Sequence, residues 1–549
     1  MPCGNFAIGD VPMHPHRRMD RTAIYALAIL LFAAAASAQR PPQLRPVQID
    51  SGKVLGVLTA DQKVVAYKGI PYAASPVGDL RWRPPQPVGR WKHILLARDF
   101  GPHCIQSGGY ADMVFHDPGP SEDCLTLNVW APVASTARPA PKHPAPLPVM
   151  VWIYGGGFTT GGTSENRQDG EFLARRGVVV VSMNYRLGVF GFMALPELTA
   201  ESANNASGNY GLMDQTAAIA WVRRNIAAFG GDPTNITIFG ESAGSQSVSA
   251  QIASPIAKGL FSKAIGESGA IFSSFSMTLP SRQQAEQTDA AWAERAFGSS
   301  RLFYLRTLTA DELLEKTMAR TTQPPRFQPD IDGLFLPDSV ANIYAAGQQA
   351  HIPVLGGWNA NESRANGKPT VASFTAQAQQ EFGADAPAFL ALYPATSDAE
   401  AEQSANDYAG DRFIAFSTWA WLEAQVKTGN APVYRYFFAL GSPGDRNHSV
   451  AQGAFHSDEI EYVFGTLDSR PEMALRPEDR ALSEQMGQYW TNFAKTGDPN
   501  GAGLPHWPVY NAAGGWLVLH LDAAPASKPD ALRPRDLFLD SQWGRAAAK

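Results

Sequence analysis

Ser242 stands at the centre of a G-x-S-x-G pattern, in the stretch Gly240-Glu241-Ser242-Ala243-Gly244. In this pattern a serine can act as a nucleophile on a sharp turn between a strand and a helix. The run from Ile236 to Phe239 predicts the strand, and the small residues from Ala243 onward predict the helix. Such a turn exposes the serine hydroxyl and aims the N–H of Ala243 at negative charge that develops beside it. The pattern also occurs by chance in glycine-rich loops, so further residues are needed to support this interpretation.

A serine nucleophile needs a base to take its proton and an acid to orient that base. In nucleophile-elbow enzymes the chain order is serine, then acid, then histidine. His351 precedes every convincing acid loop, and spacing alone does not choose between His448 and His456. We favour His456 because Gly453-Ala-Phe-His456 places it in a loop just before the compact run Ile460 to Phe464. The histidines that follow Ser242 are His351, His448, His456, His506 and His520.

Glu362 is the candidate acid. It follows the apolar run Ile352-Pro-Val-Leu-Gly356, which predicts a core strand. Open α/β sheets place functional loops just beyond the ends of such strands. A single carboxylate in a loop is usually a solvated charge, so its position rather than its residue type supports the assignment.

Gly155-Gly-Gly157 supplies a third requirement of ester chemistry. Attack on an ester carbonyl creates an oxyanion, and preorganised N–H groups stabilise it by roughly 3–4 kcal/mol per donor. Three glycines at the end of a strand allow successive N–H groups to turn inward, since no Cβ is in the way. A glycine-rich tract could instead bind phosphate, but neither Gly-Lys-Ser/Thr nor G-x-G-x-x-G accompanies it.

A metal site is the other catalytic alternative. The stretch His456-Ser-Asp-Glu459 offers possible ligands, yet no H-E-x-x-H motif or paired cysteine cluster accompanies it. The sequence therefore predicts neither a metal nor a cofactor.

The elements that must position these residues alternate between strands and helices. That alternation predicts an α/β fold with a mainly parallel sheet in one large domain, and a helical insertion from Leu279 to Pro329. The Pro- and Ala-rich segment from Pro132 to Pro148 predicts an exposed loop. The predicted strands are Leu125–Trp130, Val149–Tyr154, Val178–Met183, Ile236–Phe239, Ile352–Gly356 and Pro432–Leu440. The predicted helices include Gln215–Phe229, Asp411–Val426 and, as the last one, Leu482–Thr496.

The composition is that of an ordinary globular protein. The 549 residues are 44% hydrophobic and 17% charged, with a formal net charge of -6. An acidic balance of this kind argues against a nucleic-acid partner.

The N-terminal residues predict a secretory signal peptide. Arg17, Arg18 and Arg21 precede an apolar run that starts at Ala23, and Ala36-Ser-Ala38 fits a cleavage site. A membrane anchor is the alternative, but the run is short for a bilayer and no stable anchor is expected. We therefore expect residues 1–38 to be removed, with Met19 as an alternative start, and residues 39–549 to form a single secreted or periplasmic domain.

Cys104 and Cys124 are the cysteines that remain once the leader, with Cys3, is removed. An even pair in an exported chain favours a disulfide over two separate thiols. The bridge would close a loop of about 20 residues and add roughly 3 kcal/mol to stability by the chain-entropy argument.

With these residues in place, the chain resembles the type-B carboxylesterase and cholinesterase-like family of α/β-hydrolases. Besides the Ser242 motif, the matching stretches are Ser121-Glu-Asp-Cys-Leu-Thr-Leu-Asn128, Trp152-Ile-Tyr-Gly-Gly-Gly-Phe158, Asn184-Tyr-Arg-Leu-Gly188, Gly357-Trp-Asn-Ala-Asn-Glu362, Gly453-Ala-Phe-His456 and Trp490-Thr-Asn-Phe-Ala494. They follow the family's order along nearly the whole mature chain.

The resemblance assigns roles to individual residues. It implies Ser242 as nucleophile, His456 rather than His448 as base, and Glu362 as acid. It also implies that Arg81 and Glu122 form a structural ion pair. It implies that Gly156, Gly157 and Ala243 donate hydrogen bonds to the oxyanion. It also implies a disulfide between Cys104 and Cys124.

The predicted function is hydrolysis of small-molecule carboxylic esters through an acyl-enzyme, with a rate that rises as His456 deprotonates between pH ~6 and ~8. The alternatives are a lipase for longer-chain esters and a non-catalytic binding protein on the same fold. The loop from Cys104 to Cys124 contains no Trp, whereas true cholinesterases use one there to bind a quaternary ammonium. We therefore expect little preference for choline esters over neutral esters.

Overall fold

The computed structural model describes residues 44–110, 112–133, 145–272, 277–441, 443, 453–471 and 473–547. The predicted leader, His448 and most of the segment Pro132 to Pro148 lie outside these residues. Residues 44–549 form one compact unit. Within the described ranges, no helix has both the length and the apolar character needed to cross a membrane.

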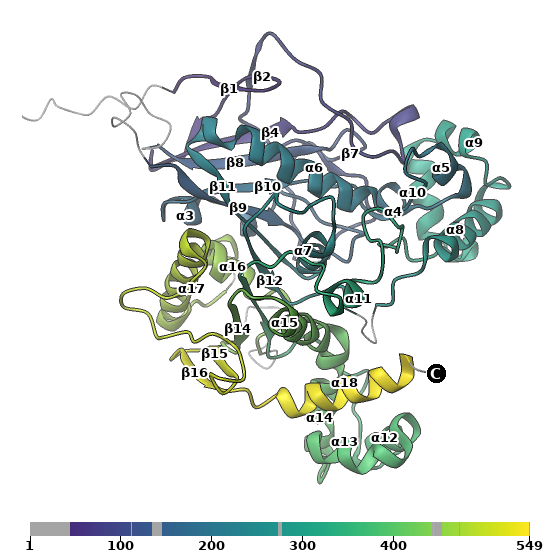
Figure 1. Cartoon of the computed structure of the whole chain (residues 1–549), viewed down its shortest axis with the longest axis vertical. Helices are drawn as coiled ribbons and strands as arrows, with labels where there is room; N and C mark the ends of the chain where they lie inside the picture. Colours follow the sequence, from purple (N-terminus) through teal and green to yellow (C-terminus); the bar gives the residue numbers. More distant parts are fainter. Residues whose placement is uncertain are drawn as a thin grey trace, which may run out of the picture. The chain divides into compact units, whose positions relative to one another are not determined.

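A long twisted sheet runs through this unit (Figure 1). Among the described residues it has 11 strands. The strands from β9 to β15 are parallel to one another, whereas every pairing that involves β3, β4, β8 or β16 is antiparallel. In spatial order they are β16 (Ala526–Pro529), β15 (Leu517–Leu521), β14 (Val433–Phe438), β13 (Val354–Asn359), β12 (Lys263–Glu267), β11 (Gly231–Glu241), β9 (Leu147–Ile153), β10 (Val179–Met183), β8 (Thr126–Pro132), β4 (Val64–Pro71) and β3 (Val57–Leu58). The smaller pairings involve β1 (Val47–Ile49), β2 (Gly52–Leu55) and β5 (Ile94–Leu96), and β6 (His103–Cys104) with β7 (Pro120–Ser121).

Helices surround the sheet and form two peripheral groups in Figure 1, α8 to α10 after β12 and α12 to α14 after β13. They are α3 (Glu171–Ala174), α4 (Gly188–Phe192), α5 (Pro196–Glu201), α6 (Tyr210–Asn225), α7 (Ala243–Ala253), α8 (Arg282–Phe297), α9 (Leu302–Thr307), α10 (Ala310–Met318), α11 (Val340–Ala345), α12 (Val371–Phe382), α13 (Ala386–Leu392), α14 (Asp398–Gly410), α15 (Phe416–Thr428), α16 (Ile460–Phe464), α17 (Pro477–Thr496) and α18 (Arg533–Ala547).

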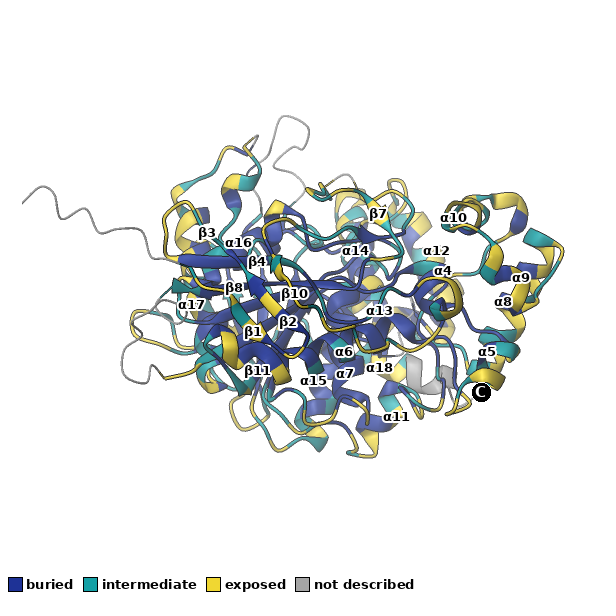
Figure 2. Ribbon diagram, turned by 90° about the horizontal axis from the view of Figure 1, so that it is seen from above, coloured by how far each residue is buried: buried dark blue, intermediate teal, exposed yellow. Residues whose placement is uncertain are grey.

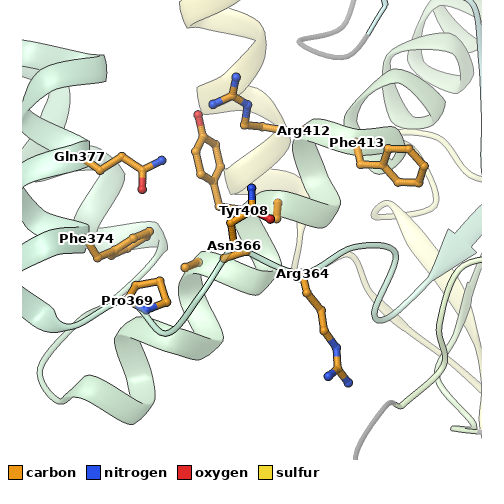
Figure 3. A pocket seen from close by; sticks show the side chains of 11 residues that line it. Arg364, Asn366, Pro369, Phe374, Gln377, Tyr408, Arg412 and Phe413 are labelled. Carbon is orange, nitrogen blue, oxygen red and sulfur yellow. The ribbon is translucent and has the colours of Figure 1, made fainter. Parts of the chain in front are cut away.

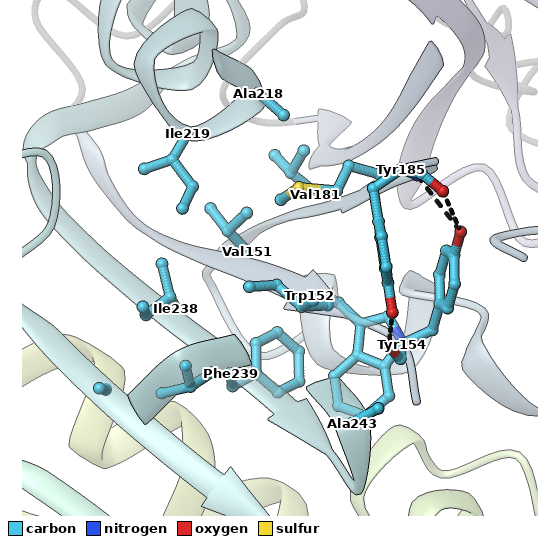
Figure 4. Close-up of a cluster of buried hydrophobic side chains, with 14 of the residues drawn as sticks. Val151, Trp152, Tyr154, Val181, Tyr185, Ala218, Ile219, Ile238, Phe239 and Ala243 are labelled. Atoms are coloured by element: carbon cyan, nitrogen blue, oxygen red, sulfur yellow. Dashed lines mark hydrogen bonds between the residues drawn. The ribbon is translucent and has the colours of Figure 1, made fainter. Parts of the chain in front are cut away.

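The central parallel strands are covered on both faces, which explains their continuous apolar sequences. All five residues of β10 are buried, as are the last five of β9. Buried residues fill the interior, and exposed residues lie mainly on peripheral helices and loops (Figure 2). Side chains alternate between the faces. Figure 4 shows Val151, Val181 and Ile238 lying toward Ala218 and Ile219 of α6.

The opposite face of the same strands is aromatic. Trp152 of β9 and Phe239 of β11 lie 4.8 Å apart between ring centroids. Both contact Phe464 of α16, at 4.9 and 5.7 Å. The strand that leads to Ser242 is therefore held between α6 on one face and α16 on the other.

The predicted α/β fold with a mainly parallel sheet is confirmed, and each predicted strand is present with boundaries shifted by a few residues. The prediction that the helix ending at Thr496 is the last one was wrong, because β15, β16 and α18 follow it. The predicted helix Asp411–Val426 instead begins as a π-helical segment, Asp411–Ala415, that continues directly from α14 into α15. Such wide turns inside helices often occur at functional sites.

Candidate active site

Ser242 lies on the turn between β11 and α7, half-buried, with a φ of 54° and a ψ of -121°. A positive φ is uncommon for a residue with a Cβ and is maintained only where surrounding structure enforces it. Here the N–H of Ser242 donates to the carbonyl of Glu267 at the end of β12, at 2.8 Å. The predicted strand–turn–helix context of the serine is thus present.

The two glycines of the pattern allow the turn to pack tightly against β9. A Cβ on Gly240 would lie 2.5 Å from the carbonyl oxygen of Ile153, and one on Gly244 would lie 2.0 Å from the same atom. A methyl group does not fit at either distance. Both positions must therefore be glycine because β9 lies so close to the start of α7.

We expect Gly244→Ala to destabilise the fold by roughly 1–3 kcal/mol, because the added methyl group overlaps the backbone of β9. Ester turnover should fall at least about tenfold, since the displaced turn carries Ser242. Urea unfolding and turnover can be compared with those of Gly89→Ala, where the added methyl group meets no atom within 4 Å. Equal stability of the two variants would contradict this packing argument.

The structure brings the three predicted triad residues into contact. Nε2 of His456 lies 2.9 Å from Oγ of Ser242, and Nδ1 lies 2.6 Å from Oε2 of Glu362. His456 and Glu362 come from two loops that are joined by a backbone bridge between Asn361 and Phe455. Of the other candidates, His351 is exposed and bonds to Gly347, and His520 lies within β15.

Glu362 is buried and its two oxygens have separate partners. Oε1 accepts from the backbone N–H of Asn359 and from the hydroxyl of Ser268, both at 2.6 Å. Oε2 remains directed to His456. The carboxylate is therefore fixed in orientation, as an acid that orients an imidazole must be. Ser268 was not among the predicted residues; its only sequence signal is its place just after the strand run of β12.

The glycine-rich bend after β9 lies against the serine turn. A Cβ on Gly155 would lie 3.0 Å from the Cβ of Ser242. Gly156 and Gly157 have φ values of 107° and 63°, which favour glycine, and Gly157 lines the same cavity as Ser242. Ala243 opens α7, where backbone N–H groups have no partner within the helix. The three predicted oxyanion residues thus flank Ser242 on two bends.

Glu241 adds a second buried carboxylate that the sequence did not indicate. Its Oε1 lies 3.3 Å from Nε2 of His456, and burial raises the pKa of Glu241 to about 8. Burial alone would lower the pKa of His456, but Glu241 and Glu362 outweigh it and raise that pKa above its ordinary value of 6.5. Neighbouring carboxylates therefore favour the imidazolium form.

This electrostatic arrangement predicts the pH dependence. Only neutral imidazole can accept the serine proton, so kcat/KM should rise as His456 deprotonates, with a midpoint in the upper part of the range pH ~6–8 or above it. Removing one carboxylate destabilises the imidazolium, so Glu241→Gln should lower the midpoint by about one pH unit. The pH–rate profile of Glu315→Gln, a substitution of an exposed glutamate, serves as the control. An unchanged or higher midpoint in Glu241→Gln would exclude this role for the carboxylate.

The triad opens into a cavity of about 1000 Å³. Its lining combines apolar side chains with charged and polar ones, among them residues that the sequence did not single out. The apolar lining residues are Met113, Val114, Met277, Phe413, Ile414 and Phe455, and the charged ones beyond the triad are Asp112, Glu165, Arg167, Glu241, Arg326, Glu461 and Arg470. Phe413, from the π-helical segment, packs edge-on against the His456 ring at 5.0 Å between centroids.

A smaller hollow of about 400 Å³ adjoins this cavity and shares Phe413 with it (Figure 3). Phe374, Gln377 and Tyr408 face one another across it, whereas the charged ends of Arg364 and Arg412 point away from each other. The hollow contains no triad residue.

The disulfide loop forms part of the cavity wall. The structure joins Cys104 to Cys124, and the loop between them contributes Tyr110, Met113 and Val114 to the lining. The ion pair expected next to this loop is present, with Nε and Nη2 of Arg81 at 2.7 and 2.6 Å from the two oxygens of Glu122.

The chain is similar to known proteins in both sequence and fold. A family model described as the Carboxylesterase family matches residues 43–536. The chain is 36% identical over 507 residues to the para-nitrobenzyl esterase of Bacillus subtilis (strain 168), covering 89% of this chain and 97% of that one. It is 36% identical over 512 residues to the fumonisin B1 esterase of Sphingopyxis macrogoltabida, covering 89% and 88% of the two chains. A solved structure of a PNB esterase superposes with a TM-score of 0.75 at 35% identity, over 90% of this chain and 100% of that chain.

Proposed function

Since this chain belongs to the carboxylesterase family, we propose that Ser242, His456 and Glu362 form its catalytic triad. The protein is a carboxylic ester hydrolase that acts on small-molecule esters.

In the first half-reaction, Oγ of Ser242 attacks the ester carbonyl while Nε2 of His456 takes the hydroxyl proton. Glu362 accepts a hydrogen bond from Nδ1–H and stabilises the imidazolium that forms. The carbonyl oxygen becomes an oxyanion, which the N–H groups of Gly156, Gly157 and Ala243 bind. The imidazolium then gives its proton to the alcohol oxygen, the alcohol leaves, and an acyl-enzyme remains.

In the second half-reaction, water takes the place of the alcohol. His456 accepts a proton from the water as its oxygen attacks the acyl carbonyl, and the same amides bind the second oxyanion. The proton returns to Ser242, and the carboxylic acid is released.

The observation that carries the proposal is the unbroken set of hydrogen bonds from Ser242 through His456 to Glu362, at 2.9 and 2.6 Å. Lone serine, histidine and glutamate residues are common in proteins, but this order of contacts at a positive-φ serine has a specific chemical use. It also disfavours a non-catalytic binding protein, which would not need the contacts. The many charged groups that line the cavity favour an esterase for polar substrates over a lipase for long acyl chains.

Partitioning by methanol tests the acyl-enzyme directly. Esters with one acyl group and different leaving alcohols should form the same acyl-enzyme, so the ratio of methyl ester to free acid should not depend on the leaving alcohol. Chromatography of the two products at a fixed methanol concentration gives the ratio. A ratio that varies with the leaving alcohol would exclude a shared covalent intermediate.

We also propose that the chain is exported, with residues 1–38 as a signal peptide and residues 39–549 as a single mature domain. The disulfide between Cys104 and Cys124 supports an oxidising compartment, because such bonds are rare in the reducing cytosol. A secreted or periplasmic esterase is the resulting localisation, and N-terminal sequencing of the mature protein would test the cleavage position.

A further inference from the structure

One wall of the catalytic cavity is built of ionisable side chains, which we call the charged wall: Asp112, Glu165, Arg167, Glu461 and Arg470. They come from three separate segments, the disulfide loop, the short turn Asn166–Gln168 with its preceding residue, and the region from α16 to Arg470. The hydroxyl of Thr466 holds two of these segments together by donating to the carbonyl of Arg167, at 2.7 Å. An esterase that used only apolar esters would not need such a wall.

Arg167 is the centre of the charged wall and is only 7% exposed. Its Nε donates to Oε2 of Glu165 at 2.8 Å, and its Nη1 donates to Oδ2 of Asp112 at 2.6 Å. Nη2 has no hydrogen-bond partner among the described residues and is not one of the atoms sealed from solvent. Arg167 lines the cavity, so its remaining N–H groups are available to a bound molecule.

The carboxylates of the wall are already engaged or are held partly neutral. Both oxygens of Glu165 accept hydrogen bonds, from Arg167 and from Nε2 of Gln168, and burial raises the pKa of Glu165 to about 7. Burial also raises the pKa of Glu461, which lies 3.8 Å from Nη1 of Arg470. The neighbouring acids, despite burial, raise the pKa of Arg167, so this guanidinium stays charged. The wall therefore places two guanidinium groups, Arg167 and Arg470, at the cavity among carboxylates that already have partners.

Apolar side chains also line the cavity. Phe413 and Ile414 come from the π-helical segment, and Met277 joins them in the lining. Phe413 is next to His456, whereas the ring of Phe455 lies beside the charged wall, 5.9 Å from Cζ of Arg470. The lining of the cavity thus offers both apolar surface and the charged wall to an ester held at Ser242.

We propose that the ester hydrolysed by this enzyme carries a carboxylate on one of its two arms, and that Arg167 binds this carboxylate through Nη2. The inference rests on the proposed function, because it places the carboxylate relative to an ester held at Ser242. The substrate class is a half-ester of a dicarboxylic acid, or an ester of a hydroxy acid. Asp112 competes for the same guanidinium and is the group that such a substrate would partly displace.

A purely structural role for Arg167 is the alternative, in which it only links the disulfide loop to the turn Asn166–Gln168 through Asp112. The two roles predict opposite effects of Asp112→Asn. A structural link would be weakened, whereas a carboxylate site would gain donor capacity and lose a competing negative charge. Asp112 has 35% of its side chain exposed, so this substitution leaves the buried core intact.

The experiment compares kcat/KM for two matched pairs of esters. Monoethyl glutarate with ethyl pentanoate places the carboxylate on the acyl arm. The butanoate ester of 4-hydroxybutanoate with butyl butanoate places it on the alcohol arm. In the unaltered protein we expect the carboxylated ester to be favoured at least about tenfold in one pair, and less so in 0.5 M NaCl.

Arg167→Gln should reduce that preference about tenfold, Arg167→Lys should retain part of it, and Asp112→Asn should raise it about threefold. Arg223→Gln, an exposed arginine outside the cavity, is the charge-matched control and should leave the preference unchanged. If Arg167→Gln does not fold, Asp112→Asn and Arg167→Lys still decide the question.

Preference for the neutral ester in both pairs, or a preference that falls in Asp112→Asn, would overturn the carboxylate site. Because each result is a ratio of two esters on one variant, it does not depend on which residue is the nucleophile. Hydrolysis that persists in Ser242→Ala would instead overturn the triad and leave this ratio intact.

Discussion

Ser242→Ala is expected to lower kcat for ester hydrolysis by roughly 10⁴–10⁶-fold, because the proposed mechanism uses its hydroxyl to form the acyl-enzyme. Oγ of Ser242 is the atom that Nε2 of His456 contacts, and alanine removes it without altering any backbone hydrogen bond. The side chain of Ser242 makes no capping hydrogen bond to α7. Thermal unfolding should therefore be nearly unchanged, and p-nitrophenyl ester turnover can be measured on a folded protein.

Ser300→Ala is the control for this variant, since Ser300 lies outside the cavity and should keep full turnover. A small residual rate is expected in Ser242→Ala, because the amides of the oxyanion bends still bind the carbonyl oxygen. Turnover within tenfold of the unaltered protein would exclude Ser242 from the mechanism. A large loss of thermal stability would instead mean that the serine is structural.

Glu362→Gln is expected to lower kcat by roughly 10³–10⁴-fold, the size of effect seen when a triad acid becomes an amide. An amide cannot stabilise the imidazolium that forms on His456 as the serine proton is transferred. The amide of glutamine can take two orientations. In one, its NH₂ group replaces Oε1, which accepts from Asn359 and Ser268 at 2.6 Å; in the other, it replaces Oε2, which faces Nδ1 of His456. In either orientation the NH₂ group therefore faces another hydrogen-bond donor.

The same substitution should change the pH–rate profile, because Glu362 is one of three carboxylates, with Glu241 and Glu459, that raise the pKa of His456. The remaining activity should rise with pH at a lower midpoint than in the unaltered protein. Glu315→Gln, at an exposed position, provides a control that changes net charge equally. A loss of less than tenfold in kcat would argue that another carboxylate, such as Glu241, orients the imidazole.

The parts of the site that sequence could predict are those determined by local patterns. The Ser242 turn needs glycines at fixed offsets because β9 approaches it so closely. That requirement can be recognised from the five residues Gly240 to Gly244 alone. The strands were predictable for a similar reason, since a parallel sheet covered on both faces needs continuous apolar runs. Glu362 could be proposed from its place after such a run.

Other features depend on contacts between distant segments and leave no local signal. Glu241 lies within the serine motif, yet its contact with His456 exists only because the loop after β14 folds over the turn. Arg167 likewise pairs with Asp112, which is brought near by the disulfide loop. His456 and His448 were equivalent by spacing, and the family resemblance distinguished them. The helix α18 was missed because its sequence, which begins Arg533-Pro-Arg-Asp, has no clear apolar periodicity.

Labelling with a fluorophosphonate tests the central claim most directly, because only a serine activated by a neighbouring base reacts rapidly with such a probe. Peptide mapping of the labelled protein should place a single phosphonate on Ser242, with complete loss of esterase activity and labelling that is strongly slowed in His456→Ala. A label on any other residue, or activity that survives full labelling of Ser242, would contradict the account.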